Sequence, residues 1–229
     1  MTNNPNGWAA PDGAKIKYLS DSEVRRFFDA VQANPDPTLR ARDLCLFKLM
    51  LHFGLRCAEA HLLQTDSVNF KVEPAQLHVV RVKEKHVRTD PKTGERVHIE
   101  KARRSDHYPL SDSDTELIKA WLKARAKFTK AKDGPLFVTI QGHPITANYI
   151  YHITARYGAK AGIEGLYPHM FRHTCAIRMA IKGYSAYEIK ERLGHASILS
   201  SEVYVNLRGP ERQKMHLRAN RAVEGDDDD

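Results

Sequence analysis

The spacing of hydrophobic side chains predicts helices in both halves of the chain and strands only between them. Apolar residues recur every three or four positions in the segments 20–31, 39–53, 112–126, 146–161 and 169–182. This is the period of a helix with one buried face. Ser20 and Ser185 each stand three residues before a glutamate, which is a helix-starting pattern, and Gly54 follows a long apolar stretch as a helix stop. We therefore expect a mainly α fold.

Alternation typical of strands is confined to the region between Gln76 and Tyr108. The segments Leu77–Val82 and Arg96–Ile99 flank the turn-forming stretch Asp90-Pro-Lys-Thr-Gly94, and this arrangement predicts a long antiparallel hairpin. Residues 135–138 could form one more short strand. The expected fold class is thus mainly α with a small antiparallel sheet (α+β), and the sequence shows no internal repeat.

Length and composition fit one main domain of a globular protein. The 229 residues contain 41% hydrophobic and 28% charged residues, and no apolar stretch approaches the roughly 18 residues of a membrane span. We expect a flexible lead-in over residues 1–17, a main domain over 18–205, a basic helix over 206–223 and a solvated acidic tail over 224–229. The amino terminus lacks a secretory signal pattern, and the three distant cysteines suit reduced thiols, so we expect a cytoplasmic location.

Basic residues dominate once the acidic tail is set aside. The whole chain carries 36 Lys+Arg and 28 Asp+Glu, and five of these acids follow the last base, so residues 1–221 carry 36 − 23 = +13. Nine of the bases lie between Arg81 and Arg104. Such a surface attracts nucleic-acid phosphates, although basic surfaces also bind acidic proteins or anionic lipid. We predict that DNA is contacted by Arg81, Lys83, Arg88, Lys101, Arg103 and Arg104.

Four residues near the carboxyl end have a chemistry that goes beyond binding. They are His169, Arg172, His195 and Tyr204. Taken singly, each is more often a packing or surface residue than a catalyst. Together they could attack a phosphodiester, because a phenolic oxygen can act as the nucleophile when cations hold the phosphate.

The order and spacing of these residues resemble those of the tyrosine recombinase (phage integrase) family. The resemblance is carried by Gly54-Leu-Arg56-Cys-Ala-Glu59, the His169-x-x-Arg172 helix, Leu193-Gly-His195 and Tyr204, and it covers the chain from about residue 18 to 204. It implies the catalytic-domain fold of that family. It also implies double-stranded DNA as the substrate and a homo-oligomer as the active form on DNA. In such an oligomer the helix over 206–223 could be exchanged between subunits, and packing on its own domain is the alternative.

The resemblance implies a role for each matched residue. Tyr204 would attack the scissile phosphate and form a 3′-phosphotyrosine, which conserves the bond energy without ATP. Arg56 and Arg172 would hold the non-bridging oxygens, a task suited to planar, permanently charged guanidinium groups. His169 would accept the tyrosine proton, His195 would donate a hydrogen bond to the phosphate, and Glu59 would orient Arg56 or the histidines.

Members of this family also use a hairpin lysine as the general acid toward the leaving 5′-oxygen. Lys85 follows the first predicted strand where the family places this lysine, so we predict Lys85. Lys101 on the return strand and Lys92 in the turn remain alternatives. For Lys85 itself, a plain phosphate or solvent contact is the other interpretation.

The chain departs from most members of this family at its amino-terminal end. Most relatives have an amino-terminal helical domain that grips the other face of DNA, and the sequence has no room for it before Tyr18. Either the sequence is part of a longer protein, or it is a compact recombinase like those that invert fimbrial promoter switches. A type IB topoisomerase, or a DNA-binding module without catalysis, would be the alternative functions. We expect no cofactor and no metal. For a metal, the twelve histidines lack paired ligand spacing such as His-x-x-x-His supported by nearby carboxylates.

Overall fold

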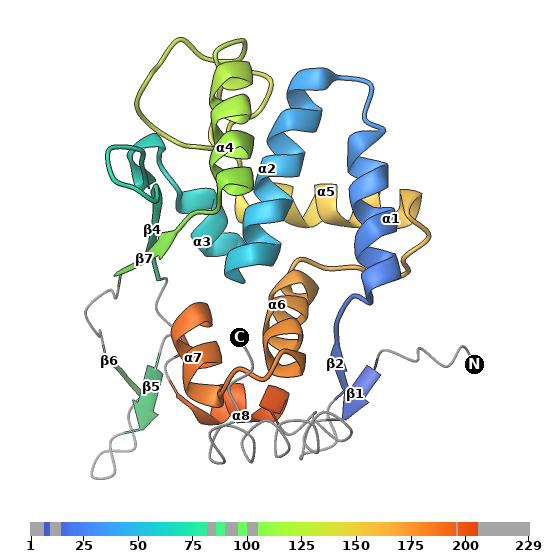
Figure 1. Cartoon of the computed structure of the whole chain (residues 1–229), viewed down its shortest axis with the longest axis vertical. Helices are drawn as coiled ribbons and strands as arrows, with labels where there is room; N and C mark the ends of the chain where they lie inside the picture. Colours follow the sequence, from blue (N-terminus) through green and yellow to red (C-terminus); the bar gives the residue numbers. More distant parts are fainter. Residues whose placement is uncertain are drawn as a thin grey trace, which may run out of the picture.

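Helices in two groups, with a small sheet at one edge, make up the molecule (Figure 1). The computed structural model describes residues 7–9, 15–81, 86–89, 96–99, 105–195 and 197–205, and the side chains of residues 16–81, 105–195 and 197–205. The observed class is mainly helical with a small antiparallel sheet, as the hydrophobic pattern predicts.

The larger group is built around one buried helix. It contains α1 (Asp21–Gln32), α2 (Pro37–Phe53), α3 (Cys57–Leu62), α4 (Asp112–Arg125) and α5 (Ala147–Lys160). Helix α2 contacts α1, α3 and α4 as well as α6 of the second group. Aromatic rings fill the space where these helices meet, with the Phe27 and Phe47 ring centroids 4.9 Å apart and Phe171 of the second group 4.9 Å from Phe27. The same contacts therefore join the two groups.

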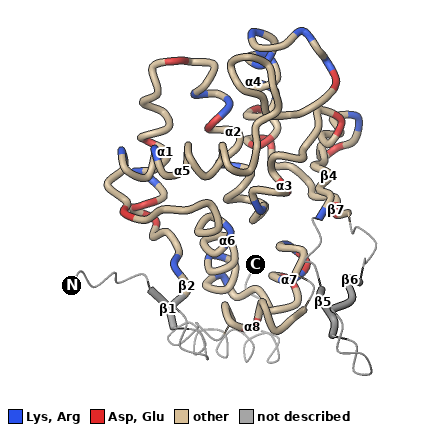
Figure 2. The backbone as a smooth tube through the Cα atoms, turned by 180° about the vertical axis from the view of Figure 1, so that it is seen from behind, with Lys and Arg blue, Asp and Glu red and all other residues tan. Residues whose placement is uncertain are grey.

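The smaller group carries most of the predicted catalytic residues. It consists of α6 (His169–Ile181), α7 (Ala186–Leu193) and α8 (Leu199–Val205). A separate hydrophobic cluster holds these helices together and includes Ile177, Ile189, Leu193 and Tyr204. Lys and Arg positions occur on α6 and α7 as well as in the larger group (Figure 2).

The sheet differs from the predicted hairpin in its pairing. Strand β4 (Gln76–Val80) lies between β3 (Val68–Asn69) and β7 (Ser105–Pro109), and Leu77 pairs with Tyr108. The predicted return strand is β6 (Arg96–Ile99), which pairs instead with β5 (His86–Thr89) in a separate two-stranded sheet. The prediction missed β7 because Ser105-Asp-His-Tyr-Pro109 buries only Tyr108 and has little apolar alternation.

Two short segments also differ in detail. Residues 135–138 form only isolated bridges, between Gln64 and Pro135 and between Val138 and Pro144, and not the predicted strand. Within the predicted lead-in, β1 (Gly7–Ala9) pairs with β2 (Lys15–Lys17). The predicted helix over residues 206–223 and the predicted acidic tail over 224–229 lie outside the described residues.

The predicted helix boundaries are confirmed by their caps. Ser20 and Ser185 each form the reciprocal capping box with the glutamate three residues later. Gly54 ends α2 in the left-handed conformation with φ 59°. Over the part of the chain that the structure describes, none of the helices is long and apolar enough to cross a membrane.

Candidate active site

The predicted catalytic residues of the described chain come from four segments that meet at one place. Arg56 and Glu59 lie at the start of α3, whereas His169 and Arg172 lie on the first turn of α6. His195 follows α7, and Tyr204 lies on α8. Burial raises the pKa of Tyr204, and the charges of Arg172 and Arg56 oppose this rise, so Tyr204 lies within the electrostatic reach of both guanidinium groups. Lys85 lies outside the described residues.

Arg56 is held by Glu59, its neighbour one helical turn away. The Arg56 Nη1 donates to Glu59 Oε1 at 2.9 Å, and the Arg56 backbone N donates to Glu59 Oε2 at 2.9 Å. Glu59 is only 1% exposed, whereas the Arg56 side chain is 20% exposed. The carboxylate therefore orients the guanidinium from inside, as expected from the i,i+3 spacing.

Arg172 lies deeper and is fixed by backbone carbonyl groups. Its Nη1 donates to the Gly54 carbonyl at 2.6 Å and its Nη2 donates to the Leu193 carbonyl at 2.8 Å. Burial and the nearby charge of Arg56 lower the pKa of Arg172 to about 10, which leaves it charged at neutral pH. These two bonds engage only part of the five N–H donors of a guanidinium.

His195 is oriented by a serine that sequence reasoning missed. Its Nδ1 lies 2.7 Å from the hydroxyl oxygen of Ser201, a residue of α8 that is fully buried. Burial, with the charges of Arg172 and Arg56 next in effect, lowers the pKa of His195 to about 3. The imidazole is therefore neutral at pH 7. If Ser201 donates to Nδ1, the proton of the ring lies on Nε2, which can then donate to a phosphate oxygen.

Tyr204 is buried and hydrogen-bonded to a histidine that was not predicted. Its hydroxyl lies 2.8 Å from Nδ1 of His173, and its ring is stacked against His195 at a centroid distance of 6.3 Å. Tyr204 is only 4% exposed, and burial raises its pKa to about 12. The phenol is therefore protonated at pH 7, and attack requires a proton acceptor.

His169 lies next to this pair at the exposed start of α6. Its ring meets that of His173 edge-on, with centroids 4.7 Å apart. Burial, followed by the charges of His169 and Arg172, lowers the pKa of His173 to about 4. Both imidazoles thus lie on the side of the site from which the tyrosine proton would leave.

The predicted DNA contact of Arg81 does not fit the structure. This side chain is 5% exposed and forms ion pairs with Glu59 and Asp106, because the end of β4 points inward toward α3 and α7 and not toward solvent. Of the other predicted DNA contacts, Arg88 lies in β5 with only its backbone described. The remaining ones lie outside the described residues: Lys83, Lys101, Arg103 and Arg104.

The sequence contains weak indications for the two site residues that were not predicted, His173 and Ser201, and for the buried position of Arg81. His173 directly follows Arg172 and lies one turn after His169, so it could have been placed on the same side of α6. Ser201 stands three residues before Tyr204, on the same buried face of α8. Arg81 is the only charged residue in an otherwise apolar strand segment, Leu77–Val82, apart from a histidine.

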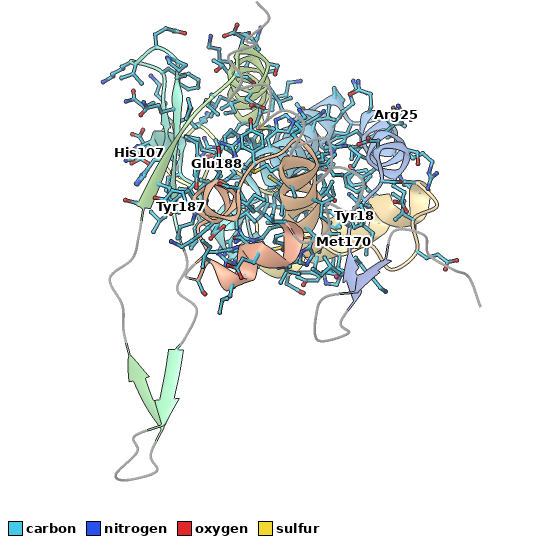
Figure 3. All side chains as sticks on the ribbon, turned by 60° about the horizontal axis from the view of Figure 1, so that its bottom comes forward. Tyr18, Arg25, His107, Met170, Tyr187 and Glu188 are labelled. Atoms are coloured by element: carbon cyan, nitrogen blue, oxygen red, sulfur yellow. The ribbon has the colours of Figure 1, made fainter. Side chains whose placement is uncertain are left out.

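A groove of about 850 Å³ lies beside this site, between β7 and the helices α6 and α7. His107 on one wall and Tyr187 and Glu188 on another are labelled in Figure 3. Its lining also includes Asp106, Tyr108 and Arg192, all of which contact Arg81. Arg81 thus connects the lining of this groove to Glu59 of the candidate site.

Comparison with solved structures identifies the fold. The crystal structure of XerA recombinase matches 89% of this chain and 65% of its own, with a TM-score of 0.67 and 20% identity. The XerH site-specific recombinase bound to palindromic difH substrate matches 90% of this chain and 53% of its own, with a TM-score of 0.65 and 23% identity. The fold is thus that of tyrosine recombinase catalytic domains, and the chain spans between half and two thirds of these two proteins.

Comparison at the sequence level identifies the family. The phage integrase family matches residues 17–209, and this chain therefore belongs to that family. It is 27% identical over 188 residues to the type 1 fimbriae regulatory protein FimB of Escherichia coli (strain K12), a match that covers 82% of each chain. The predicted membership and fold are confirmed.

Proposed function

We propose that the chain is a site-specific DNA recombinase that cuts and rejoins DNA strands through a 3′-phosphotyrosyl intermediate on Tyr204. The observation that carries this proposal is the buried Tyr204 hydroxyl, which lies 2.8 Å from an imidazole nitrogen and within the electrostatic reach of two arginines. A buried structural tyrosine needs one hydrogen-bond partner for its hydroxyl, but it does not need two nearby arginines. Membership of the phage integrase family supports the same assignment.

The two arginines would stabilise the charge that develops on the phosphate. Arg172 is fixed by two carbonyl groups and Arg56 by a buried carboxylate, so neither has to reorganise when the phosphate arrives. Preorganised donors of this kind contribute several kcal/mol at a developing charge, roughly 3–4 kcal/mol for one donor. His195, held by Ser201, would add a neutral hydrogen-bond donor to the same phosphate.

The proton of Tyr204 would leave through the two histidines of α6. His169 is the proposed final acceptor, because it lies at the exposed start of the helix, and His173 already contacts the hydroxyl. Proton transfer to the leaving 5′-oxygen is assigned to Lys85, with Lys101 and Lys92 as the alternatives. Replacing each lysine and using a 5′-bridging sulfur leaving group tests this assignment, because only loss of the true acid is rescued.

The burial of Tyr204 implies one further step. A side chain that is 4% exposed cannot reach a DNA phosphate from solution. We expect DNA binding to shift α8 so that the hydroxyl faces Arg56 and Arg172, while the two histidines of α6 stay within reach of its proton. A short helix of seven residues, attached to the body mainly through α6 and α7, is suited to such a shift.

Double-stranded DNA is the proposed partner, and two or more copies of the chain are proposed to assemble on it. Support for DNA comes from the related XerH structure, which is bound to its difH substrate. That substrate is palindromic, and a two-fold symmetric site suits a symmetric pair of proteins. Because the proposed substrate is DNA, we expect the chain to act in the cytoplasm, associated with the nucleoid.

A nicked suicide substrate tests the proposed function. A nick next to the scissile phosphate lets the cleaved end diffuse away, so that a covalent protein–DNA adduct accumulates without metal or ATP. The adduct should form with the wild-type chain and disappear in Tyr204→Phe. DNA binding without any adduct would instead indicate a binding module. Adducts that relax supercoiled DNA but never join two labelled sites would indicate a topoisomerase.

A further inference from the structure

Arg81 is a buried charge near the site, and its guanidinium group has hydrogen bonds to four other residues. Its Nε donates to Asp106 Oδ2 at 2.8 Å, and its Nη1 donates to Glu59 Oε2 at 2.9 Å. Its Nη2 donates to the Tyr108 hydroxyl and to the carbonyl of Arg192 at 2.9 Å. One side chain at the end of β4 thus links α3, β7 and the last turn of α7.

The first of these links leads to the phosphate-binding arginines. Glu59 Oε2 accepts from Arg81 while Oε1 accepts from Arg56, so the two guanidinium groups hold the same carboxylate from two directions. Glu59 Oε2 also lies 3.9 Å from Nη1 of Arg172. Removing Arg81 would leave Oε2 with only the hydrogen bond from the Arg56 backbone N. The carboxylate could then turn toward Arg172, and the Arg56 guanidinium would lose its fixed orientation.

The second link leads to the turn that carries His195. Arg81 binds the carbonyl of Arg192, and Arg172 binds the next carbonyl, that of Leu193. Cations at the carboxyl end of a helix are favoured by its dipole. Gly194 follows with φ 64°, and a Cβ atom there would overlap Nε of Arg81. The turn is therefore shaped around the Arg81 side chain.

We propose that Arg81 is a positioning residue for the phosphate site, which fixes Arg56 through Glu59 and fixes His195 through the α7 turn without touching DNA. This inference rests on the proposed recombinase function. It replaces the predicted role of Arg81 as a DNA contact. It also explains why a charged side chain occupies an otherwise apolar strand end.

A matched pair of substitutions separates positioning from plain stability. Arg81→Met removes the charge and keeps the length of the side chain. Arg125→Met is the control, because Arg125 is also buried, at 4% exposure, and donates to the carbonyls of Pro135 and Ala131 in a different part of the fold. Both variants lose a buried guanidinium, but only the first loses a link to the site.

The measurement is the single-turnover rate of covalent adduct formation on a nicked suicide substrate at saturating DNA. We expect Arg81→Met to slow this rate about 10–100-fold, as is typical when an outer partner of a site residue is lost. Its Kd for DNA should stay at the wild-type value, since Arg81 does not contact phosphate. Arg125→Met should melt at a lower temperature but react at the wild-type rate once folded.

A second substrate gives a readout that stability alone cannot change. Replacing one non-bridging oxygen of the scissile phosphate with a methyl group removes its negative charge, so the rate depends less on well-placed arginines. The wild-type to Arg81→Met rate ratio should therefore move toward one on this methylphosphonate. If Arg81→Met does not fold, Tyr108→Phe replaces it, because it removes only the hydroxyl shared by Arg81 and the α7 carbonyl groups.

Several results would overturn the inference. They are a wild-type rate in Arg81→Met, a defect confined to Kd, or an equal rate ratio on both substrates. If Tyr108→Phe is used in place of Arg81→Met, a wild-type rate of adduct formation in that variant would also overturn the inference. An absence of adduct in the wild-type chain would refute the proposed function instead, so the two failures can be told apart.

Discussion

Glu59→Gln tests how far the site depends on one buried carboxylate. Glu59 is 1% exposed and accepts three hydrogen bonds of 2.9 Å, two from Arg56 and one from Arg81. Glutamine has nearly the same shape, but its NH₂ group must face one of these donors whichever way the amide is turned. The substitution also removes the only carboxylate that Arg56, Arg81 and Arg172 all approach among the described residues.

The expected cost follows from this burial. Removing one partner of a buried ion pair costs about 3–5 kcal/mol, because the remaining charge is left uncompensated. This is a large part of the roughly 5–15 kcal/mol by which domains are stable. Glu116→Gln is the matched control: Glu116 also pairs with a base three residues away, Lys119, at 2.9 Å, but the two side chains are 71% and 54% exposed. Its loss should cost about 0–1 kcal/mol.

Urea unfolding is the appropriate assay, because urea is uncharged and does not screen ion pairs as guanidinium salts do. The midpoint of Glu59→Gln should fall with an unchanged slope, and its rate of DNA adduct formation should also fall. If Glu59→Gln loses no more free energy of unfolding than Glu116→Gln, the Glu59 carboxylate does not stabilise the buried arginines of the site.

Three further predictions concern the α7 turn and the histidine that follows it. Gly194→Ala should lower stability by more than the roughly 1 kcal/mol that a left-handed alanine costs, because its Cβ overlaps Arg81, whereas Gly162→Ala has open space and should show only the backbone cost; equal losses in thermal melts would contradict this. Ser201→Ala should slow adduct formation with unchanged DNA binding, because the orientation of His195 is lost; a wild-type rate would argue against that role. Since burial lowers the pKa of His195 to about 3, from 6.5 in the unfolded chain, its contribution to the free energy of unfolding is present above pH 6.5 and is lost as the pH falls toward 3; His195→Asn should flatten this slope, and an unchanged slope would be inconsistent with a neutral buried imidazole.

Hydrophobic periodicity and capping residues were sufficient to predict most of the helices. Ser20, Gly54 and Ser185 act through local geometry, which depends only on neighbouring residues. Strand pairing was predicted less well, because the partner of β4 lies beyond an intervening two-stranded segment and is set by tertiary packing of Tyr108. Local alternation contains no information about which of two later segments will pair.

The site shows the same division between local and long-range information. Arg56 and Glu59 could be paired from their spacing, and the family resemblance supplied the order of the other residues. The contacts of His173 with Tyr204 and of Ser201 with His195 depend on how α8 packs on α6 and α7. Arg81 was misassigned because charge alone does not show whether a strand end faces solvent or a buried carboxylate.

Peptide mapping of the protein–DNA adduct tests the central claim most directly. The chain is incubated with a nicked suicide duplex without metal, the adduct is digested with protease and nuclease, and the nucleotide-bearing peptide is sequenced by mass spectrometry. We predict a nucleotide attached through its 3′-phosphate to Tyr204. A nucleotide attached to any other residue, or one joined through its 5′-phosphate, would contradict the mechanism.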